Sequence, residues 1–289
     1  MHDVGVCSWS LKPDGHAQLV ERLRACGPAG RAVQIALDPI REERWDEHAT
    51  RGALAAAGVR VLSGMMGTRG ENYATLETIR ATGGVRADEH WPANLAAARG
   101  NARLARAWGI DLVTFHAGFL PHEAADPLRA VMLDRLRQMT CAFADEGVRI
   151  AFETGQEDAP TLLGVLEELA AVCPPGFAPG VNFDPANMIL YGMGDPVAAL
   201  SLLAPHVRQV HIKDALPTRR PGTWGTEVVV GTGAVDWARF LAVVEARLPG
   251  VALVIEREAG ADRGGDILAA ADVLARHLPG RIRLLEGGA

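Results

Sequence analysis

Four short apolar segments carry side chains of the types that bind metal ions. Glu153 lies in IAFETG, Asp184 in VNFDPAN, His211 in QVHIKD and Glu256 in LVIERE. Taken singly, such a histidine is usually a packed core residue, and such a glutamate is usually solvated or paired with arginine. If the segments are neighbouring barrel strands, their ends meet at one mouth, where three carboxylates need a cation. Oxygen ligands with one imidazole suit Mn²⁺, Mg²⁺, Co²⁺ or Zn²⁺, so the sequence predicts one divalent metal site.

The residues that follow His211 and Glu256 are also expected near this mouth. Side chains alternate along a strand, so Lys213 points the same way as His211, and Glu258 the same way as Glu256. Lys213 and Glu258 are therefore candidates for contact with a substrate. Asp214 begins the next loop, where it either orients His211 or caps the turn.

Eight apolar segments rich in Val and Ile are predicted to be strands buried on both faces. They cover residues 4–10, 32–37, 59–64, 110–118, 148–155, 180–187, 207–214 and 251–258. Amphipathic stretches separate them, and several end in glycine, as helix C-termini do. Eight strand–helix units favour a (β/α)8 TIM barrel, a single α/β domain over residues 1–289. An open doubly wound sheet is the alternative, but the first strand–helix joint, CSWSLKPDG, lacks the GxGxxG pattern.

Two connections between the predicted strands are long. Residues 65–91 follow the third strand and residues 215–236 follow the seventh, and the second connection is predicted to hold a short hairpin around Glu227–Val230. Both would emerge at the C-terminal face of a barrel, where barrel enzymes build their active sites.

Composition and charge argue against several classes of protein. The chain is 48% apolar and 22% charged, as is ordinary for a soluble globular protein, and its net charge of −6 disfavours nucleic acid as a partner. The four cysteines have no CxxC spacing, so we expect them to be reduced. We find no apolar run long enough for a membrane span and no secretory signal. We therefore expect a cytoplasmic protein without a membrane partner.

Several motifs resemble those of a known superfamily. FHAG, FETG, FDPAN, VHIKDA, VGTGAVDW and VIERE together look like the sugar phosphate isomerase/epimerase superfamily. Its members are xylose isomerase-like TIM barrels, which include ketose 3-epimerases and inosose dehydratases and are related to endonuclease IV. The resemblance implies that Glu153, Asp184, His211 and Glu256 bind one divalent metal. It also implies that Glu153 and Glu256 are the catalytic acid and base, which move a proton through a metal-stabilised enediolate.

The sequence departs from this superfamily at two places. The 3-epimerases have a histidine three residues after the strand-six aspartate, where this chain has Asn187, and Arg219 and Arg220 do not cleanly match their substrate-binding arginine. Asn187 is still expected to form a hydrogen bond with a substrate hydroxyl.

Other residues are weaker candidates for substrate contact. His116 matches a strand-four motif and either lines the pocket or packs in the core. Trp9 either forms a wall for a sugar ring or packs in the core. The endonuclease IV relatives bind three zinc ions and need the missing histidine, so DNA repair is not expected.

These observations favour a metal-dependent isomerase or epimerase of a ketose, a sugar phosphate or a sugar-derived keto compound. An inosose dehydratase-like lyase is the main alternative. An endonuclease IV-like phosphodiesterase and a sugar-binding barrel without turnover are less favoured. The expected partner is a small sugar or sugar-derived substrate, and the resemblance also allows a homo-oligomer.

Overall fold

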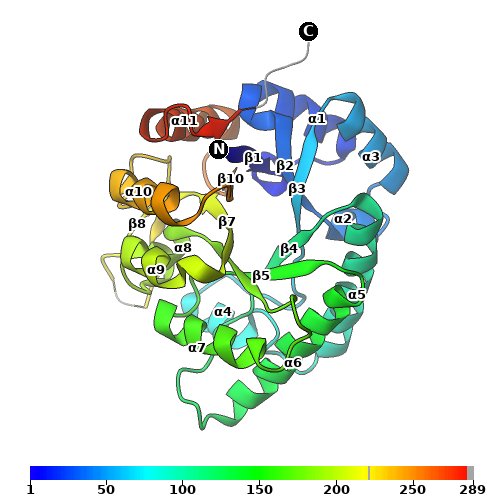
Figure 1. Ribbon diagram of the computed structural model, residues 1–289, viewed down its shortest axis with the longest axis vertical. Helices are drawn as coiled ribbons and strands as arrows, with labels where there is room; N and C mark the ends of the chain where they lie inside the picture. Colours follow the sequence, from blue (N-terminus) through cyan, green and yellow to red (C-terminus); the bar gives the residue numbers. More distant parts are fainter. Residues whose placement is uncertain (221, 285–289) are drawn as a thin grey trace.

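Eight parallel strands form a closed barrel in the computed structural model, which describes residues 1–220 and 222–284. The barrel closes because β10 pairs with both β7 and β1 (Figure 1). In barrel order the strands are β1 (His2–Cys7), β2 (Ala32–Ala36), β3 (Arg60–Met65), β4 (Leu112–Phe115), β5 (Arg149–Glu153), β6 (Gly180–Phe183), β7 (Val207–Ile212) and β10 (Ala252–Ile255). The predicted TIM barrel is confirmed, and the open sheet is excluded. A short strand that the pattern does not predict, β11 (Ile282–Arg283), also pairs with β1.

Burial on both faces explains the composition of the strands. Every residue of β4 and β6 is buried, and in β5 only Arg149 is exposed. A barrel strand contacts the filled interior on one side and the helix layer on the other, so it needs a continuous apolar run rather than an alternating one. Phenylalanines of adjacent strands pack together in this core; the rings of Phe115 and Phe152 meet edge to face with centroids 5.4 Å apart.

Helices surround the barrel (Figure 1). They are α1 (His16–Ala25), α2 (Asp38–Arg41), α3 (Glu47–Ala56), α4 (Leu76–Thr82), α5 (Trp91–Trp108), α6 (Pro127–Ala144), α7 (Ala159–Ala170), α8 (Pro185–Tyr191), α9 (Pro196–Leu203), α10 (Trp237–Arg247) and α11 (Arg263–His277). The part of the chain that the structure describes also has short 3-10 helices, which are η1 (Ser8–Leu11), η2 (Gly27–Arg31) and η3 (Ala204–His206). Among the described residues, none of the helices combines the length and the apolar character that crossing a membrane requires.

Aspartate followed by proline starts several helices. Asp126, Asp184 and Asp195 each accept hydrogen bonds from amides of the first turn, and each directly precedes a proline. Aspartate is a favoured N-cap, and proline at the first helical position loses no hydrogen bond. At Asp184 this pattern ends β6 and begins α8 within one residue.

The strands end earlier than the sequence pattern suggests. Trp9, which is part of the first predicted strand (residues 4–10), lies in η1 instead, and His116 and Glu256 each follow their strand by one residue. At the mouth the chain must turn outward to reach the next helix, so these residues leave the hydrogen-bonded ladder.

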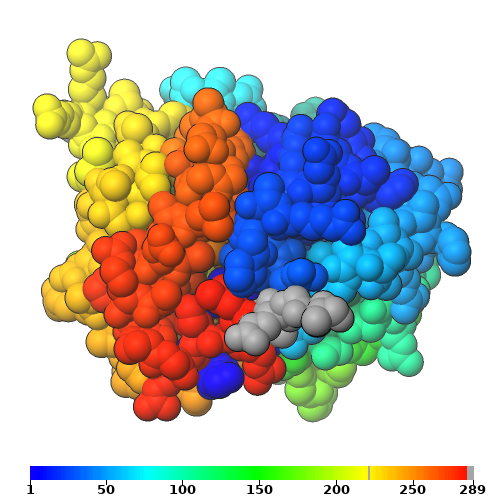
Figure 2. Space-filling view, turned by 90° about the horizontal axis from the view of Figure 1, so that it is seen from above, coloured from blue at the N-terminus to red at the C-terminus, as the bar shows by residue number. Residues whose placement is uncertain are grey.

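Both long connections lie at the C-terminal ends of barrel strands, as predicted. The first contains α4, and the second contains an antiparallel pair, β8 (Asp214–Leu216) and β9 (Thr226–Val228). The expected hairpin is therefore present: β9 overlaps the predicted residues 227–230, and its partner strand β8 lies earlier in the chain. In Figure 2 the cyan atoms of the first connection and the yellow atoms of the second stand at the same end of the molecule. They touch there, because the ring of Tyr73 stacks on Trp224 with centroids 6.4 Å apart.

Candidate functional site

Four side chains from successive strands of the barrel meet at its C-terminal mouth. Glu153 ends β5, Asp184 and Glu256 directly follow β6 and β10, and His211 lies in β7. One ligating atom of each lies within 4.8 Å of the others, and all four residues are buried. They meet because β5, β6, β7 and β10 are neighbours in the barrel. The structure thus brings the four predicted ligands together, and their role as ligands stays a prediction.

The imidazole of His211 presents one nitrogen to the carboxylates. Its Nδ1 lies 3.5 Å from Glu153 Oε1, 3.9 Å from Asp184 Oδ2 and 3.4 Å from Glu256 Oε2. Burial by itself lowers the pKa of His211, but its acidic neighbours outweigh burial and raise that pKa well above the ordinary value. Without a metal ion the ring is therefore expected to carry a proton on both nitrogens, and a metal ion would replace one of them.

Asp184 uses its two carboxylate oxygens differently. Oδ1 accepts the backbone N–H groups of Ala186 and Asn187 at 2.8 and 3.0 Å and so caps α8. Oδ2 is buried and accepts no hydrogen bond. Burial raises the pKa of this carboxyl to about 7. A buried oxygen without a hydrogen bond, facing an imidazole and two other carboxylates, fits a bound cation, although the Lys213 ammonium also lies 3.7 Å away.

Glu256 is held by a buried cation and by an indole. Lys213 Nζ lies 2.9 Å from Glu256 Oε2, 2.6 Å from Glu258 Oε2 and 3.7 Å from Asp184 Oδ2. Trp9 Nε1 donates to Glu256 Oε1 at 2.6 Å. Burial raises the pKa of Glu256, but its cationic neighbours, Lys213 first, hold it well below the ordinary range. Glu256 is therefore ionised, with each oxygen oriented by its own donor.

Glu153 is held by two amides and faces an imidazole. Asn187 Nδ2 donates to Oε1 at 3.0 Å, Asn182 Nδ2 donates to Oε2 at 3.3 Å, and His116 Nε2 lies 3.8 Å from Oε1. The approach of Asn187 depends on Gly155, which has φ of +133° and where an added Cβ would lie only 2.4 Å from the Asn187 Cβ. The glycine thus lets α8 pack against the end of β5.

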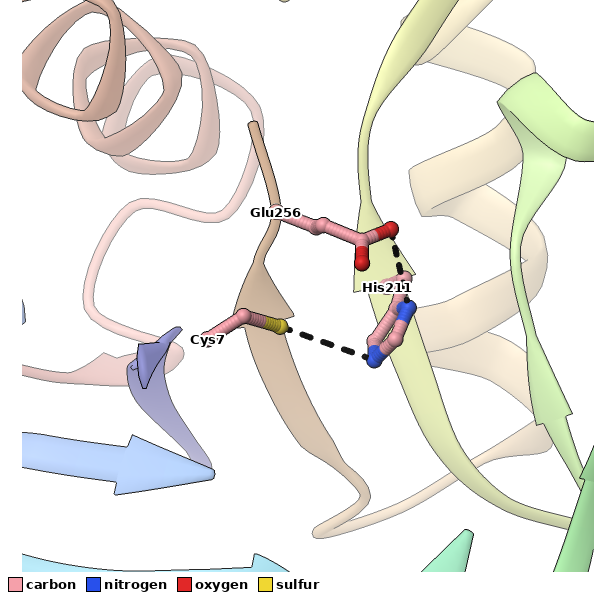
Figure 3. A group of neighbouring side chains, drawn as sticks. All are labelled: Cys7, His211 and Glu256. Atoms are coloured by element: carbon pink, nitrogen blue, oxygen red, sulfur yellow. Dashed lines mark hydrogen bonds and ion pairs between the residues drawn. The ribbon is translucent and has the colours of Figure 1, made fainter. Parts of the chain in front are cut away.

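Cys7 of β1 lies on the other side of His211. Its Sγ is 3.7 Å from Nε2, whereas Glu256 approaches Nδ1, so the ring lies between the two residues (Figure 3). Cys7, His211 and Glu256 form a second group of ligand types with atoms within 4.8 Å of one another. Burial raises the pKa of the Cys7 thiol to about 12, so the thiol stays protonated and is a poor ligand. The set of three carboxylates and one imidazole is therefore the better candidate for a metal site.

A pocket of about 580 Å³ at the mouth reaches the four candidate ligands through Glu256. Its lining combines aromatic and aliphatic walls with a few acidic groups, and among the described residues it includes neither arginine nor lysine. The lining residues are Trp9, Ala36, Asp38, Met65, Gly67, Glu71, Tyr73, His116, Asn187, Leu190, Tyr191, Trp224, Glu256 and Glu258. Trp224 connects the aromatic residues of the wall, since its ring contacts the rings of both Tyr73 and Tyr191. The ring centroids of Trp224 and Tyr191 are 4.9 Å apart.

Most of the predicted substrate contacts lie on this pocket. Those that line it are His116, Asn187, Trp9 and Glu258. Lys213 does not line it, because its ammonium is buried among carboxylates. Asp214 does not contact the His211 ring; its carboxylate accepts the backbone N–H groups of residues 215, 231, 233 and 235 and the indole N–H of Trp237. Asp214 therefore holds the 215–236 connection in place.

Two groups of residues escape prediction from the sequence. One is the aromatic wall of Tyr73, Tyr191 and Trp224, since aromatic residues in loops have no periodic signal. The other is a layer of buried polar side chains inside the barrel, formed by Gln34, Ser63, Thr114, Asn182 and Gln209. Part of this layer does have a signal: Gln209 precedes His211 by two residues and Asn182 precedes Asp184 by two, so each shares a strand face with a candidate ligand.

Comparison with known proteins agrees with the TIM barrel seen in the structure. The family model described as "Xylose isomerase-like TIM barrel" matches residues 20–277. The solved structure of a xylose isomerase domain protein from Planctomyces limnophilus is 29% identical and has a TM-score of 0.81 over 96% of this chain and 97% of that one. A D-allulose 3-epimerase from Methylomonas sp. is 15% identical, with a TM-score of 0.70 over 96% of this chain and 98% of that one, a likeness of fold alone. The uncharacterized protein YihM of Escherichia coli (strain K12) is 43% identical over 60 residues, which are 20% of this chain and only 18% of YihM.

Proposed function

Because the chain belongs to the xylose isomerase-like TIM barrel family, we propose that it is a divalent-metal-dependent isomerase or epimerase of an unphosphorylated ketose or sugar-derived keto compound. The observation that carries this proposal is the buried group of three carboxylates and one imidazole, whose ligating atoms lie within 4.8 Å of one another. Glu153, Asp184, His211 and Glu256 would hold one ion, and their donor set suits Mn²⁺, Mg²⁺, Co²⁺ or Zn²⁺.

The two glutamates supply the proton transfer. A divalent ion at this site would draw electron density from a substrate carbonyl and so acidify the neighbouring C–H bond. One glutamate, as the carboxylate, removes that proton, and the other, after it has taken up a proton from water, returns that proton to the carbon. Their orienting groups differ: Trp9 and Lys213 hold Glu256, whereas two asparagine amides hold Glu153. Carboxylates that are fixed independently can act on different sides of one substrate, as epimerisation requires.

The pocket lining supports a substrate without a phosphate group. Proteins usually bind phosphate through Arg, Lys or a helix N-terminus. Among the described residues neither cation lines this pocket, and Lys213, buried beside it, is already paired with carboxylates. Glu71 and Glu258 on the wall would repel a phosphate. Trp9 and Tyr191 instead offer apolar faces of the kind that pack against the C–H face of a sugar.

A lyase that expels water after the same proton removal is the second candidate, and His116 favours it. This side chain lines the pocket 3.8 Å from Glu153, and its Nδ1 is buried without a hydrogen-bond partner. An imidazole in this place is suited to protonate a leaving hydroxyl. A trinuclear phosphodiesterase site is less favoured, because the two candidate ligand groups among the described residues share His211 and Glu256.

Exchange of carbon-bound hydrogen in D₂O tests the proposal. The Mn²⁺-loaded protein is incubated with ketoses, inososes and their phosphates, and proton NMR is recorded after removal of protein and metal. We expect exchange next to the carbonyl of an unphosphorylated compound, and we expect EDTA to stop it. A new stereocentre at the exchanging carbon would identify an epimerase, and a dehydrated product would identify the lyase. Exchange that persists in EDTA, or that occurs only with phosphorylated compounds, would contradict the proposal.

A further inference from the structure

A layer of uncharged polar side chains crosses the barrel on the inner side of His211. Its members come from five different strands and are fully buried. They are Gln34 of β2, Ser63 of β3, Thr114 of β4, Asn182 of β6 and Gln209 of β7. Buried amides and hydroxyls destabilise a core unless every polar atom is bonded, so the hydrogen bonds of this layer define how each member is oriented.

The amide of Gln34 has one orientation that satisfies both of its ends. Its Nε2 donates to Thr114 Oγ1 at 2.8 Å and to the carbonyl oxygen of Gly64 at 3.3 Å. Its Oε1 therefore points the other way, where it accepts from Gln209 Nε2 at 2.9 Å and lies 2.8 Å from His211 Nε2. If the amide were reversed, its oxygen would face the carbonyl oxygen of Gly64, and its NH₂ group would face the NH₂ group of Gln209.

An oxygen beside Nε2 decides which nitrogen of His211 keeps its hydrogen when the ring gives up a proton to bind an ion. A carboxamide oxygen only accepts, so Nε2 must donate to Gln34. Asn182 Nδ2 does not compete as a donor to Nε2. It lies 3.0 Å from Nε2 and 3.5 Å from Nδ1. Because these two ring nitrogens flank the same ring carbon, an atom at these distances lies along the lone pair of neither nitrogen. The Cys7 thiol also donates toward Gln34 Oε1, at 3.6 Å.

We propose that Gln34 is a positioning residue that keeps hydrogen on His211 Nε2 and so reserves Nδ1 for the metal ion. Figure 3 shows the two sides of the ring: Nδ1 faces Glu256, and Nε2 faces away toward Cys7. The inference rests on the metal centre proposed above. Hydrogen-bond partners of this kind change metal affinity by about 10–100-fold when they are removed.

Three variants separate positioning from general support of the core. Gln34→Leu removes the acceptor, whereas Gln34→Glu keeps an acceptor oxygen of the same reach. Ser63→Ala is the control, since it removes a buried hydroxyl of the layer that bonds to Gln209 and to neither Gln34 nor His211. Zn²⁺ serves as a diamagnetic probe, and its dissociation constant is measured by competition with a chromophoric chelator. Thermal unfolding of each metal-free variant reports its stability.

The tautomer is read directly by long-range ¹H–¹⁵N NMR of protein labelled at its nine histidines. The His211 signals are assigned by comparison with His211→Asn. In the wild-type protein with Zn²⁺ we expect a metal-bound Nδ1 and a protonated Nε2. We expect Gln34→Leu to bind Zn²⁺ about 10–100-fold more weakly. Gln34→Glu should restore affinity to near the wild-type value, and Ser63→Ala should keep that affinity despite reduced stability.

Zn²⁺ bound through Nε2 in the wild-type protein would overturn the inference, and this measurement needs no variant to fold. Wild-type affinity in Gln34→Leu would also overturn it, as would an equal loss in Ser63→Ala, which would indicate a structural role alone. A wild-type protein that binds no Zn²⁺ would refute the metal centre together with this inference. Bound Zn²⁺ with an unaffected Gln34→Leu refutes the role of Gln34 only.

Discussion

Loss of the Lys213 charge should destabilise the protein far more than loss of an equally close surface charge. Lys213→Met keeps a long unbranched side chain and removes the ammonium group. Lys213 Nζ is 2.9 Å from Glu256 Oε2, and the side chains are only 3% and 4% exposed. Removal of one partner of such a buried pair costs about 3–5 kcal/mol, because a carboxylate is left without its cation. With about 2 cal/mol/K of unfolding entropy for each of the 289 residues, the Tm of the metal-free protein should fall by about 5–8 °C.

A surface pair of the same length is the control. Arg281 Nε is also 2.9 Å from Glu245 Oε1, but these side chains are 65% and 46% exposed. Solvent reduces such a pair to about 0–1 kcal/mol, so Arg281→Met should lower Tm by less than about 2 °C. Scanning calorimetry in EDTA compares the two variants, and circular dichroism verifies their folds. A decrease for Lys213→Met no larger than that for Arg281→Met would refute the inference that Lys213 neutralises the buried Glu256 carboxylate.

Metal affinity should rise with pH, because Asp184 and His211 must both lose protons when an ion binds. Burial raises the pKa of Asp184 to about 7, and acidic neighbours raise the pKa of His211. Calorimetric titration should therefore show tighter binding at about pH 8 than at about pH 6, and equal affinities would contradict the assigned ligands. Glu153→Gln should slow C–H exchange in D₂O by about 10²–10⁴-fold, as loss of a general base does, and near-wild-type exchange would exclude Glu153 from the proton transfer. Trp224→Ala should raise KM and change kcat little, because Trp224 forms the pocket wall with Tyr191 and is not in the metal group. A lower kcat with an unchanged KM would contradict that role.

The repeating part of the fold is predictable from the sequence because each strand is marked locally. The eight apolar segments correspond to β1–β7 and β10, and each needs only its own Val- and Ile-rich composition to be found. Closure of the barrel by β10 and β1 is not local, but it follows from the number of strand–helix units. The exact strand ends are less predictable, as Trp9 shows, since a residue that leaves the ladder can keep the composition of the strand before it.

The candidate ligands are predictable for the same reason, whereas the pocket around them is not. A charged residue at the end of an apolar run, such as Glu153, is visible in the sequence without any knowledge of its neighbours. The contact of Tyr73 with Trp224 joins two loops far apart in the chain, and no pattern within either loop predicts it. The same holds for Lys213, whose position suggests a contact with substrate but whose three carboxylate partners bury it instead.

The sequence by itself determined the barrel and the four residue types that meet at its mouth, and with them the kind of chemistry available. Only the tertiary structure decided the state of each group: the Oδ2 of Asp184, which accepts no hydrogen bond, the ion-paired Glu256, and the nitrogen of His211 that faces the carboxylates. The physical reason is that the charge and hydrogen-bonding state of a side chain depend on the groups that surround it in space. For His211 one of those groups is Gln34, which folding brings from β2 to within 2.8 Å of a ring on β7.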